Sequence, residues 1–536
     1  MELVRAQKLS FTYSGGAKAL SCASMTVGEG EFVLLVGASG CGKTTLLRLF
    51  KPEIAPFGEL HGELELLGTK AERGMAVPKI GFVMQDPQAQ AVSDTVNGEL
   101  AFGLINQGLA AEEISRVIGE TASFFGISQL MDRRLDTLSG GERQLVSICS
   151  VMVMKPKLLI LDEPLSRLDP LAAARLVELL GRINRETGAA VLIAEHHCEG
   201  LFELCDKAYF MNEGKILDCC RKEEKFSTGF NSFLPCAARI ASVSKVYKKT
   251  PLNVREGICF LRENYSAVQI EIRQAASACT VLEGQELYFS YGEKPVLSGC
   301  NVKLFQGEVL SIIGANGCGK STLIHCLSGA VKPSHGKVKL FGKALKSYKN
   351  GSLYRNNITV MPQEPQDIFT KQSVGEELDY AAGLFSAGAL KEELVKRLEL
   401  SKIMDTHPYD LSGGELQIFA LARLLMTDPK VILLDEPVKG LDPDSRTKVG
   451  QLIRELAAEG RSVLMVTHDL EFAAEYSDRC AMLFDGALQG QLTTGELFTR
   501  NEFYTTPAAR ICRGHFQGVY TVAQAQRIIK EQDSAD

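Results

Sequence analysis

Two glycine-rich loops, one in each half of the chain, end in a lysine followed by a hydroxyl residue. Both have the pattern Gly-x-x-x-x-Gly-Lys-(Ser/Thr), with Lys43 in the first and Lys320 in the second. Glycines let the backbone curl so that successive N–H groups point at phosphate oxygens, and the following helix adds its positive end. The lysine neutralises phosphate charge and the hydroxyl ligates Mg²⁺, so the loops predict two nucleotide sites. The expected contacts are Gly37, Ser39, Gly40, Cys41, Gly42, Lys43, Thr44 and Thr45 in the first loop, and Gly314, Asn316, Gly317, Cys318, Gly319, Lys320, Ser321 and Thr322 in the second.

A pair of carboxylates follows a short apolar run in each half. Asp162 and Glu163 come after the first run, and Asp435 and Glu436 come after the second. A buried strand of this kind delivers the aspartate to Mg²⁺ or to its water shell. The neighbouring glutamate can orient the water that attacks the γ-phosphate, or accept its proton. A lone Asp-Glu pair is also compatible with capping a helix, but its recurrence after a phosphate loop in both halves favours catalysis.

A histidine and a glutamine complete each set. His196 and His468 follow the glutamates at almost the same distance in the two halves, which favours contact with the γ-phosphate over a purely structural role. Gln85 and Gln363 follow the lysines at similarly matched distances, where they can sense the metal or the attacking water and report nucleotide state to a partner. The expected catalytic residues are Gln85, Glu163 and His196, and Gln363, Glu436 and His468; the expected Mg²⁺ ligands are Thr44, Gln85 and Asp162, and Ser321, Gln363 and Asp435.

An aromatic residue precedes each phosphate loop. Tyr13 and Tyr291 both close a Leu-x-Phe-x-Tyr pattern. The face of such a ring can stack on an adenine base. The alternative is a strand tyrosine that packs within its own sheet, and the sequence favours stacking only slightly.

The elements that must position these residues follow from the pattern of apolar runs. Residues 31–36 and 308–313 are short apolar runs that end at the glycine loops, so each is expected to be a buried strand. Further strands are expected to end at the Asp-Glu pairs and close to the histidines. The stretch before residue 138 has helical spacing at Ile114, Val117, Ile118 and Phe125. Alternating strands and helices predict an α/β fold with a mostly parallel core and active loops at the carboxyl ends of the strands.

The Leu-Ser-Gly-Gly-Glu segments at residues 138–142 and 411–415 decide the class. Together with the glutamines, the histidines and Leu-Asp-Pro at 168–170 and 441–443, they resemble the ABC ATPase family over about residues 3–220 and 281–490. The resemblance implies two P-loop NTPase domains that use ATP, each with a parallel core, an antiparallel β subdomain and a helical signature subdomain. It also implies intramolecular head-to-tail pairing, in which the Lys43 site is completed by Ser412, Gly413 and Gly414, and the Lys320 site by Ser139, Gly140 and Gly141.

The repeat extends beyond the histidines. Ala-Ala-Arg-Ile at 237–240 recurs at 508–511, and residues 254–261 and 522–529 are expected to be matching short helices. We therefore expect an ATPase domain at 1–222, a C-terminal appendage of the first copy and a junction at 223–278, a second ATPase domain at 279–500, and the second appendage at 501–536. Chance recurrence of four residues is the alternative. The appendages are expected to help hold the two halves together.

Bulk properties exclude several classes. The net charge of −6 gives no sign of a nucleic-acid partner. The first residues lack a cationic-then-apolar signal, and no apolar run approaches the roughly 20 residues needed to span a bilayer, so any membrane role must pass through partner proteins. The 15 cysteines are then expected to be reduced thiols.

The segment around Gln85 resembles one branch of the family in particular. Gln-Asp-Pro-Gln-Ala-Gln at 85–90, Asp-Thr-Val at 94–96 and Glu-Leu-Ala-Phe-Gly at 99–103 are similar to the ATPases of energy-coupling factor (ECF) importers for metal ions and vitamins. The second copy departs from that pattern at 363–366 and 373–377. The resemblance implies an integral membrane coupling subunit and a small substrate-binding membrane subunit as partners, with the chain peripheral on the cytoplasmic face of the cell membrane.

Two other functions remain open. A soluble ribosome-associated ATPase of the ABC-F kind is also a tandem protein, but usually has Asn-His where this chain has Ser166-Arg167 and Lys439-Gly440. A tandem sugar-importer ATPase often has one weakened site and an asparagine in the signature region, and neither is seen here. A ribosome-recycling ATPase needs an N-terminal cysteine-rich cluster that this sequence lacks.

Overall fold

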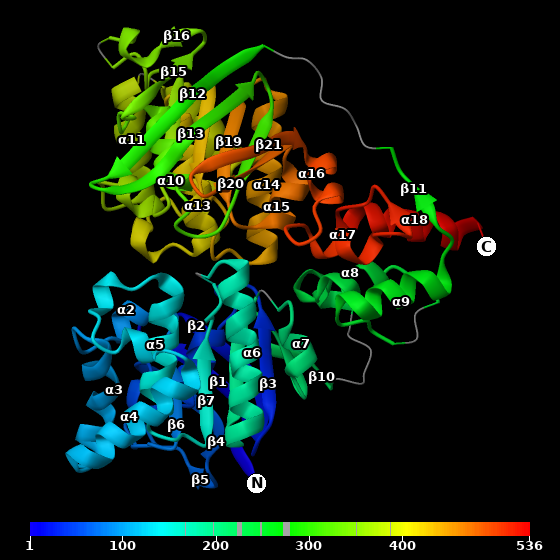
Figure 1. Cartoon of the computed structure of the whole chain (residues 1–536). Helices are drawn as coiled ribbons and strands as arrows, with labels where there is room; N and C mark the ends of the chain where they lie inside the picture. Colours follow the sequence, from blue (N-terminus) through cyan, green and yellow to red (C-terminus); the bar gives the residue numbers. More distant parts are fainter. Residues whose placement is uncertain are drawn as a thin grey trace. The chain divides into compact units, whose positions relative to one another are not determined.

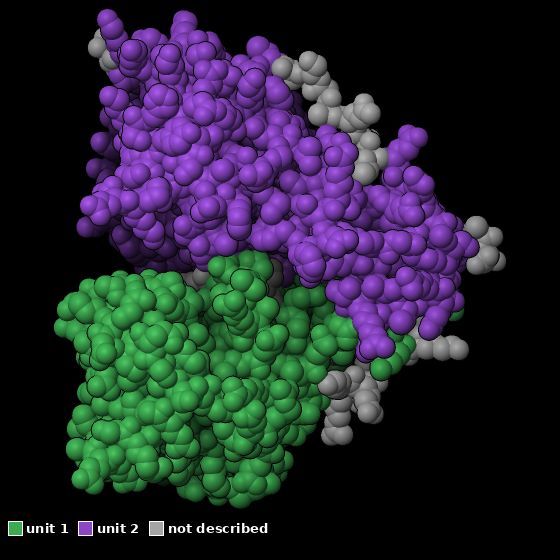
Figure 2. Space-filling view, in the orientation of Figure 1, with its two compact units in different colours: residues 1–242, 246–253 green, residues 243–245, 254–536 purple. Residues whose placement is uncertain are grey.

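The computed structural model describes residues 1–166, 168–196, 198–221, 228–246, 249–271, 279–349, 351–385 and 387–535. The chain divides into two compact units (Figure 2). The first comprises Met1–Ser242 and Val246–Asn253, and the second comprises Val243–Lys245 and Val254–Asp536. Each unit is built around a six-stranded, mostly parallel sheet and a four-stranded antiparallel sheet, which confirms the predicted α/β class.

The central sheet of the first unit has the strand order β10-β9-β3-β8-β7-β6, in which only the β9–β10 pair is antiparallel. Every residue of β3, β7 and β8 is buried, as expected for parallel strands covered on both faces. The antiparallel sheet has the order β2-β1-β4-β5. The strands are β1 (Glu2–Tyr13), β2 (Lys18–Gly28), β3 (Phe32–Gly37), β4 (Gly58–Leu66), β5 (Thr69–Lys70), β6 (Ile80–Val83), β7 (Leu158–Asp162), β8 (Ala190–Glu195), β9 (Lys207–Asn212) and β10 (Lys215–Arg221).

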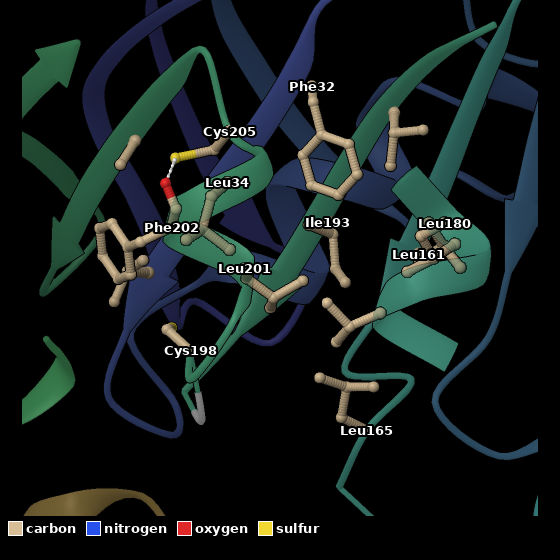
Figure 3. Packing of buried hydrophobic residues seen from close by; sticks show 14 of the residues in the cluster. Phe32, Leu34, Leu161, Leu165, Leu180, Ile193, Cys198, Leu201, Phe202 and Cys205 are labelled. Atoms are coloured by element: carbon tan, nitrogen blue, oxygen red, sulfur yellow. Dashed lines mark hydrogen bonds between the residues drawn. The ribbon is translucent and has the colours of Figure 1, made fainter. Parts of the chain in front are cut away.

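Two hydrophobic clusters line the central sheet of the first unit. One contains Leu34, Leu161 and Ile193, with Phe202 on a short helix beside them (Figure 3). The other joins the sheet to the antiparallel strands and α1. A third cluster holds α3, α4 and α5 together as a helical subdomain (Figure 1). The helices are α1 (Lys43–Leu49), α2 (Pro87–Gln90), α3 (Val96–Asn106), α4 (Ala111–Phe125), α5 (Gly140–Met152), α6 (Pro170–Thr187), α7 (Leu201–Leu204) and α8 (Cys236–Ala241).

The second unit repeats this plan. Its central sheet has the order β17-β18-β19-β14-β20-β21, and its antiparallel sheet has the order β13-β12-β15-β16. The strands are β11 (Val268–Gln269), β12 (Thr280–Tyr291), β13 (Lys294–Phe305), β14 (Val309–Ile313), β15 (His335–Leu340), β16 (Lys343–Ala344), β17 (Ile358–Met361), β18 (Val431–Asp435), β19 (Ser462–Thr467), β20 (Arg479–Phe484), β21 (Ala487–Thr493) and β22 (Phe516–Gln517). The helices are α9 (Val254–Asn264), α10 (Lys320–Ser328), α11 (Val374–Phe385), α12 (Gly388–Arg397), α13 (Gly413–Leu425), α14 (Pro443–Ala458), α15 (Leu470–Tyr476), α16 (Thr494–Arg500), α17 (Pro507–Cys512) and α18 (Val522–Ala535).

Segments that follow the first copy pack with the end of the chain inside the second unit. β11 pairs in parallel with β22, so that Val268 lies opposite Phe516. The Asp533 carboxylate on α18 accepts a hydrogen bond from the Lys245 backbone N–H at 2.9 Å and from the Tyr265 hydroxyl at 3.1 Å. The recurring Ala-Ala-Arg-Ile segments are helical in both copies, in α8 and α17. Residues 243–245 and 254–271 therefore share a small subdomain with the C-terminal segment of the chain, closed by contacts far apart in sequence.

Candidate functional site

The first phosphate loop joins β3 to α1. Gly42 has φ of 105°, and a Cβ atom there would lie 2.6 Å from the Ala19 carbonyl oxygen, so the position requires glycine. The Lys43 side chain is 4% exposed and turns back over the loop, where its ammonium donates to the carbonyl oxygens of Gly37 at 2.8 Å and Ala38 at 2.9 Å. The loop thus holds a buried cation at the N-terminus of a helix, which is the arrangement expected of a phosphate site.

The second loop has the same geometry between β14 and α10. Gly319 has φ of 104°, and the Lys320 ammonium donates to the carbonyl oxygens of Gly314 at 2.9 Å and Ala315 at 3.1 Å. Lys320 is 6% exposed. Both copies therefore contain the predicted loop in full.

Oxygen donors suited to Mg²⁺ meet beside each lysine. The Thr44 hydroxyl donates to Oδ1 of Asp162 at 3.1 Å, and burial raises the pKa of Asp162 to about 6. Burial also raises the pKa of Asp435, while the Ser321 hydroxyl acts in the opposite direction. Oδ1 of Asp435 is buried and finds no hydrogen-bond partner among the described residues. A hydroxyl and a buried carboxylate with an unsatisfied oxygen fit a hard cation that binds oxygen, so the residues present fit Mg²⁺.

Glu163 is the centre of the charged cluster in the first unit. Its carboxylate lies 3.1 Å from the Lys43 ammonium and 3.6 Å from Nδ1 of His196, and it accepts a hydrogen bond from Nε2 of Gln85 at 2.9 Å. Burial by itself would raise the pKa of Glu163, but the His196 and Lys43 contacts outweigh it and hold that pKa at about 2. The residue has φ of 47°, a left-handed conformation that is uncommon outside glycine. Such a conformation must be maintained by the surrounding contacts.

The cluster in the second unit is similar but not identical. The Glu436 carboxylate lies 3.4 Å from the Lys320 ammonium and 2.9 Å from Nδ1 of His468. The residue again has a positive φ, of 50°. Burial would raise the pKa of Glu436, but His468 and Lys320 lower it overall. Within the described residues no hydrogen bond joins Gln363 to Glu436, so the two sites differ in their glutamine contact.

The two candidate adenine-stacking residues lie in the antiparallel sheets. Tyr13 ends β1, is 37% exposed, and its hydroxyl lies 2.7 Å from Oγ1 of Thr45 on α1. Tyr291 ends β12 and is 56% exposed. Each ring meets a phenylalanine of its own strand edge to face, which leaves the stacking role a prediction.

The signature segments form helix starts. Ser139 caps α5, and Ser412 caps α13, each in a reciprocal capping box with the glutamate three residues later. The first-turn N–H groups of Gly140 and Gly141, and of Gly413 and Gly414, are those that a helix leaves for an external acceptor. No hydrogen bond or ion pair among the described residues joins Ser139 to the Lys43 cluster. In each unit, the lysine of the phosphate loop, the glutamate and the histidine do lie together.

One charged residue of the first cluster, Glu195, was not predicted from the sequence. Glu195 ends β8 directly before His196, is 0% exposed, and accepts a hydrogen bond from the Leu165 backbone N–H at 2.7 Å. The signal was available as a carboxylate at the end of an apolar strand, at the position where the second copy has Thr467. Its burial, however, is visible only in the structure.

Among the residues that the structure describes, no helix is both long enough and apolar enough to cross a membrane.

The chain is similar in sequence to proteins that are already known. The sequence profile of the family described as "ABC transporter" matches residues 20–166 and 297–439. A Bacillus cereus protein named "Putative ABC transporter ATP-binding protein" is 38% identical over 522 residues, which cover 94% of each chain. The "Putative HMP/thiamine import ATP-binding protein YkoD" of Bacillus subtilis is 32% identical over 512 residues, 93% of each chain.

The tandem arrangement also has a counterpart among solved structures. A chain from the crystal structure of the complex of archaeal ribosomal stalk protein aP1 and archaeal ribosome recycling factor aABCE1 aligns with a TM-score of 0.59. The alignment covers 92% of this chain and 91% of that one, at 23% identity. At that identity the likeness concerns the fold alone.

Proposed function

The chain belongs to the ABC transporter family, as a tandem ATP-binding protein and ATPase, and we propose that it energises a membrane importer of the ECF type. The importer assignment rests on one observation above all. The segment after Gln85 carries the pattern similar to importer ATPases, and residues of this segment line a cavity of the first unit. The name of the YkoD relative, which refers to import, agrees with this proposal.

In each site the residues of this chain have distinct roles. Lys43 and Lys320 bind the β- and γ-phosphates. Mg²⁺ would be held in the first site by Thr44 with Asp162, and in the second site by Ser321 with Asp435. When bound, the ion supplies neutralisation of the phosphate charge. Glu163 and Glu436 orient the attacking water and accept its proton, since their low pKa values keep them ionised. His196 and His468 contact the γ-phosphate, and Gln85 and Gln363 monitor the metal and the water.

The signature helices complete the sites in trans. Ser412, Gly413 and Gly414 contribute to the Lys43 site, and Ser139, Gly140 and Gly141 to the Lys320 site. Support comes from the capped helix starts of α5 and α13, whose first-turn N–H groups suit a phosphate acceptor. Covalent fusion of the two copies raises their mutual effective concentration. The shared subdomain of α9, α17 and α18 would reinforce this pairing.

The proposed docking surface lies in the helical subdomain of the first unit. A cavity of about 340 Å³ is lined by Pro87, Gln88 and Asp94, and by Arg134 and Arg143. The nearby helix α3 exposes Phe102 and Ile105. Apolar side chains beside a mixed-charge hollow fit a short amphipathic helix of a membrane subunit. Gln85 hydrogen-bonds Glu163 from the same segment, so docking at this surface can be relayed to the catalytic glutamate.

Extraction of the full-length protein from native membranes in mild detergent tests the proposal. Small integral membrane proteins should copurify with it, and Phe102→Asp should release them. Leu217→Asp is the matched control, because Leu217 is an exposed apolar residue on β10 at the opposite edge of the sheet from β6. Sedimentation with ribosomes instead of membranes would support the ABC-F alternative and overturn the importer assignment.

A further inference from the structure

The buried carboxylate of Glu195 holds two backbone segments of the first site. Oε1 accepts a hydrogen bond from the Leu165 N–H at 2.7 Å, and Oε2 accepts one from the His196 N–H at 3.3 Å. Leu165 is the second residue after Glu163, and His196 follows Glu195 directly. One side chain therefore connects the loop that leaves the catalytic glutamate to the loop that carries the histidine.

Leu165 is fixed from its other end by packing. Its side chain is 7% exposed and belongs to the same hydrophobic cluster as Ile193 and Leu201 (Figure 3). The backbone N–H is held by Glu195 while the side chain is held by the core. Glu163 has a left-handed backbone conformation, so it depends on neighbours that keep its loop in place.

The second site lacks this connection. Thr467 stands at the position of Glu195, and its hydroxyl accepts a hydrogen bond from the Asp469 N–H at 3.0 Å instead. Val438 corresponds to Leu165, and among the described residues no side chain accepts from its backbone N–H. The copies thus share their catalytic groups and differ in how those groups are supported.

We propose that Glu195 is a positioning residue of the first ATP site. By holding the backbone of Leu165 and of His196, it keeps the side chains of Glu163 and His196 correctly placed relative to each other. This inference rests on the proposed roles of Glu163 and His196 in hydrolysis. It predicts that substitution of Glu195 affects the first site alone, because the second copy has Thr467 at this position and supports its catalytic residues without the carboxylate. Among the described residues, no hydrogen bond joins Glu195 to the predicted metal ligands Thr44, Gln85 and Asp162; it holds the backbone of Leu165 and of His196 instead.

The electrostatic surroundings agree with a carboxylate that is retained for its hydrogen bonds. Burial raises the pKa of Glu195 to about 7; His196 lowers it, Glu163 raises it, and the two N–H contacts lower it. Other titratable groups beside this region are Lys43, Cys198, Glu199 and Cys205, which interact electrostatically with His196 or with Cys198. Burying a carboxylate costs folding free energy unless hydrogen bonds compensate it. The second copy has a threonine at this position, so the fold does not need the carboxylate merely to fill the space.

The test measures steady-state ATP hydrolysis by the full chain with Glu195→Thr, Glu195→Gln and Glu163→Gln. The reference quantity is the part of the turnover that Glu163→Gln removes, since this part belongs to the first site. We expect Glu195→Thr to lower the turnover of the first site about tenfold, which is the effect expected when a hydrogen bond to a charged group is lost. The KM for ATP should change less than about twofold. Glu195→Gln keeps one acceptor oxygen for the Leu165 N–H, so its turnover at the first site should lie between that of Glu195→Thr and that of wild type.

The pH profile supplies a readout that a purely structural role would not move. Wild-type turnover at the first site should rise as pH increases through about 7, where Glu195 becomes ionised, and the rise should be absent in Glu195→Gln. Glu308→Gln is the control, because Glu308 is a buried carboxylate that accepts a backbone N–H from Phe305 and pairs with Arg479 at 3.1 Å, at the opposite end of β14 from the second phosphate loop. Its turnover should stay within about twofold of wild type.

Two failures are distinguishable. Unchanged turnover in Glu163→Gln would contradict the proposal that the first site hydrolyses ATP. Reduced turnover in Glu163→Gln together with wild-type kinetics in Glu195→Thr overturns only the role of Glu195. A loss in Glu195→Thr that appears entirely in KM, or that Glu195→Gln does not relieve, also overturns it.

Discussion

The ammonium of Lys43 lies 3.1 Å from the carboxylate of Glu163, with both side chains almost fully buried. The group proposed to bind phosphate and the group proposed to activate water thus neutralise each other. A γ-phosphate bound by Lys43 competes with Glu163 for the same cation, so nucleotide binding and release of the carboxylate are coupled. Lys320 and Glu436 repeat the pair at 3.4 Å.

Lys43→Ala should weaken nucleotide binding at the first site only. A charge-assisted contact contributes about 1.5–3 kcal/mol, so we expect the affinity of that site for ATP to fall by roughly tenfold to a hundredfold. Equilibrium binding of ATP to the purified chain measures this as weaker binding at one of two sites. Lys320→Ala should weaken binding at the other site. Two sites of unchanged affinity in Lys43→Ala would contradict the assignment.

Glu163→Gln should separate binding from hydrolysis. Loss of a general base typically costs about 10²- to 10⁴-fold in rate, and we expect the first site to fall within that range. Affinity for ATP should be kept or increased, because Lys43 no longer faces a competing carboxylate. Steady-state turnover and ATP binding check the two halves of the prediction, with Glu436→Gln as the matched variant of the second site. Turnover that is untouched in Glu163→Gln means that the first site is not catalytic.

Gln85 and Gln363 should respond differently to the same substitution. Gln85 donates to Glu163 at 2.9 Å, whereas no hydrogen bond is recorded between Gln363 and Glu436 in the described part of the chain. Loss of that hydrogen bond, about 1 kcal/mol, should lower turnover by a few-fold more in Gln85→Ala than in Gln363→Ala. Parallel kinetics of the two variants decide this, and equal effects would show that the Gln85 contact is unimportant for catalysis.

Asp533→Ala should destabilise the shared terminal subdomain. The change removes the acceptor of the Lys245 N–H and one of the two acceptors of the Tyr265 hydroxyl, which also contacts Ser244, at a cost of about 1 kcal/mol. Thermal unfolding should show a lower Tm than wild type. Glu531→Ala on the same helix is the control, because Glu531 is exposed and its ion pair with Arg527 is a surface contact of small energy. Deletion of residues 505–536 should go further and weaken association of the halves; unchanged association and ATPase activity would argue against a tethering role.

The raised pKa of Glu195 makes stability depend on pH in a defined direction. A carboxyl whose pKa is about 7 in the folded chain, above its ordinary value of 4.5, binds its proton more tightly when folded. Its contribution is therefore complete below about pH 4.5 and is lost as pH rises through about 7. The Tm of wild type relative to Glu195→Gln should fall between pH 5 and pH 8. Asp162 titrates in the same window with the same sign, but it is present in both proteins and cancels in the comparison. A constant difference in Tm would contradict the buried position of Glu195.

Motifs that act locally could be read from the sequence alone. The glycine loops, the Asp-Glu pairs and the signature serines each consist of a strand end or helix start with its adjacent turn, where backbone geometry depends on a few consecutive residues. The glycine with φ of 105° at position 42 and the capping boxes at Ser139 and Ser412 illustrate this. Repetition of the same local patterns in both halves also predicted two α/β units and the family to which the chain belongs.

Contacts between distant segments required the tertiary structure. The order of the parallel strands places β8 between β3 and β7, which buries Glu195 and brings it to Leu165. Pairing of β11 with β22 likewise joins residues separated by most of the second copy. Local sequence determined which chemical groups this protein has and the backbone turns that present them. Only the folded chain decided which of them meet and how deeply they are buried, because burial and long-range hydrogen bonds depend on strand order and packing, which short-range patterns do not specify.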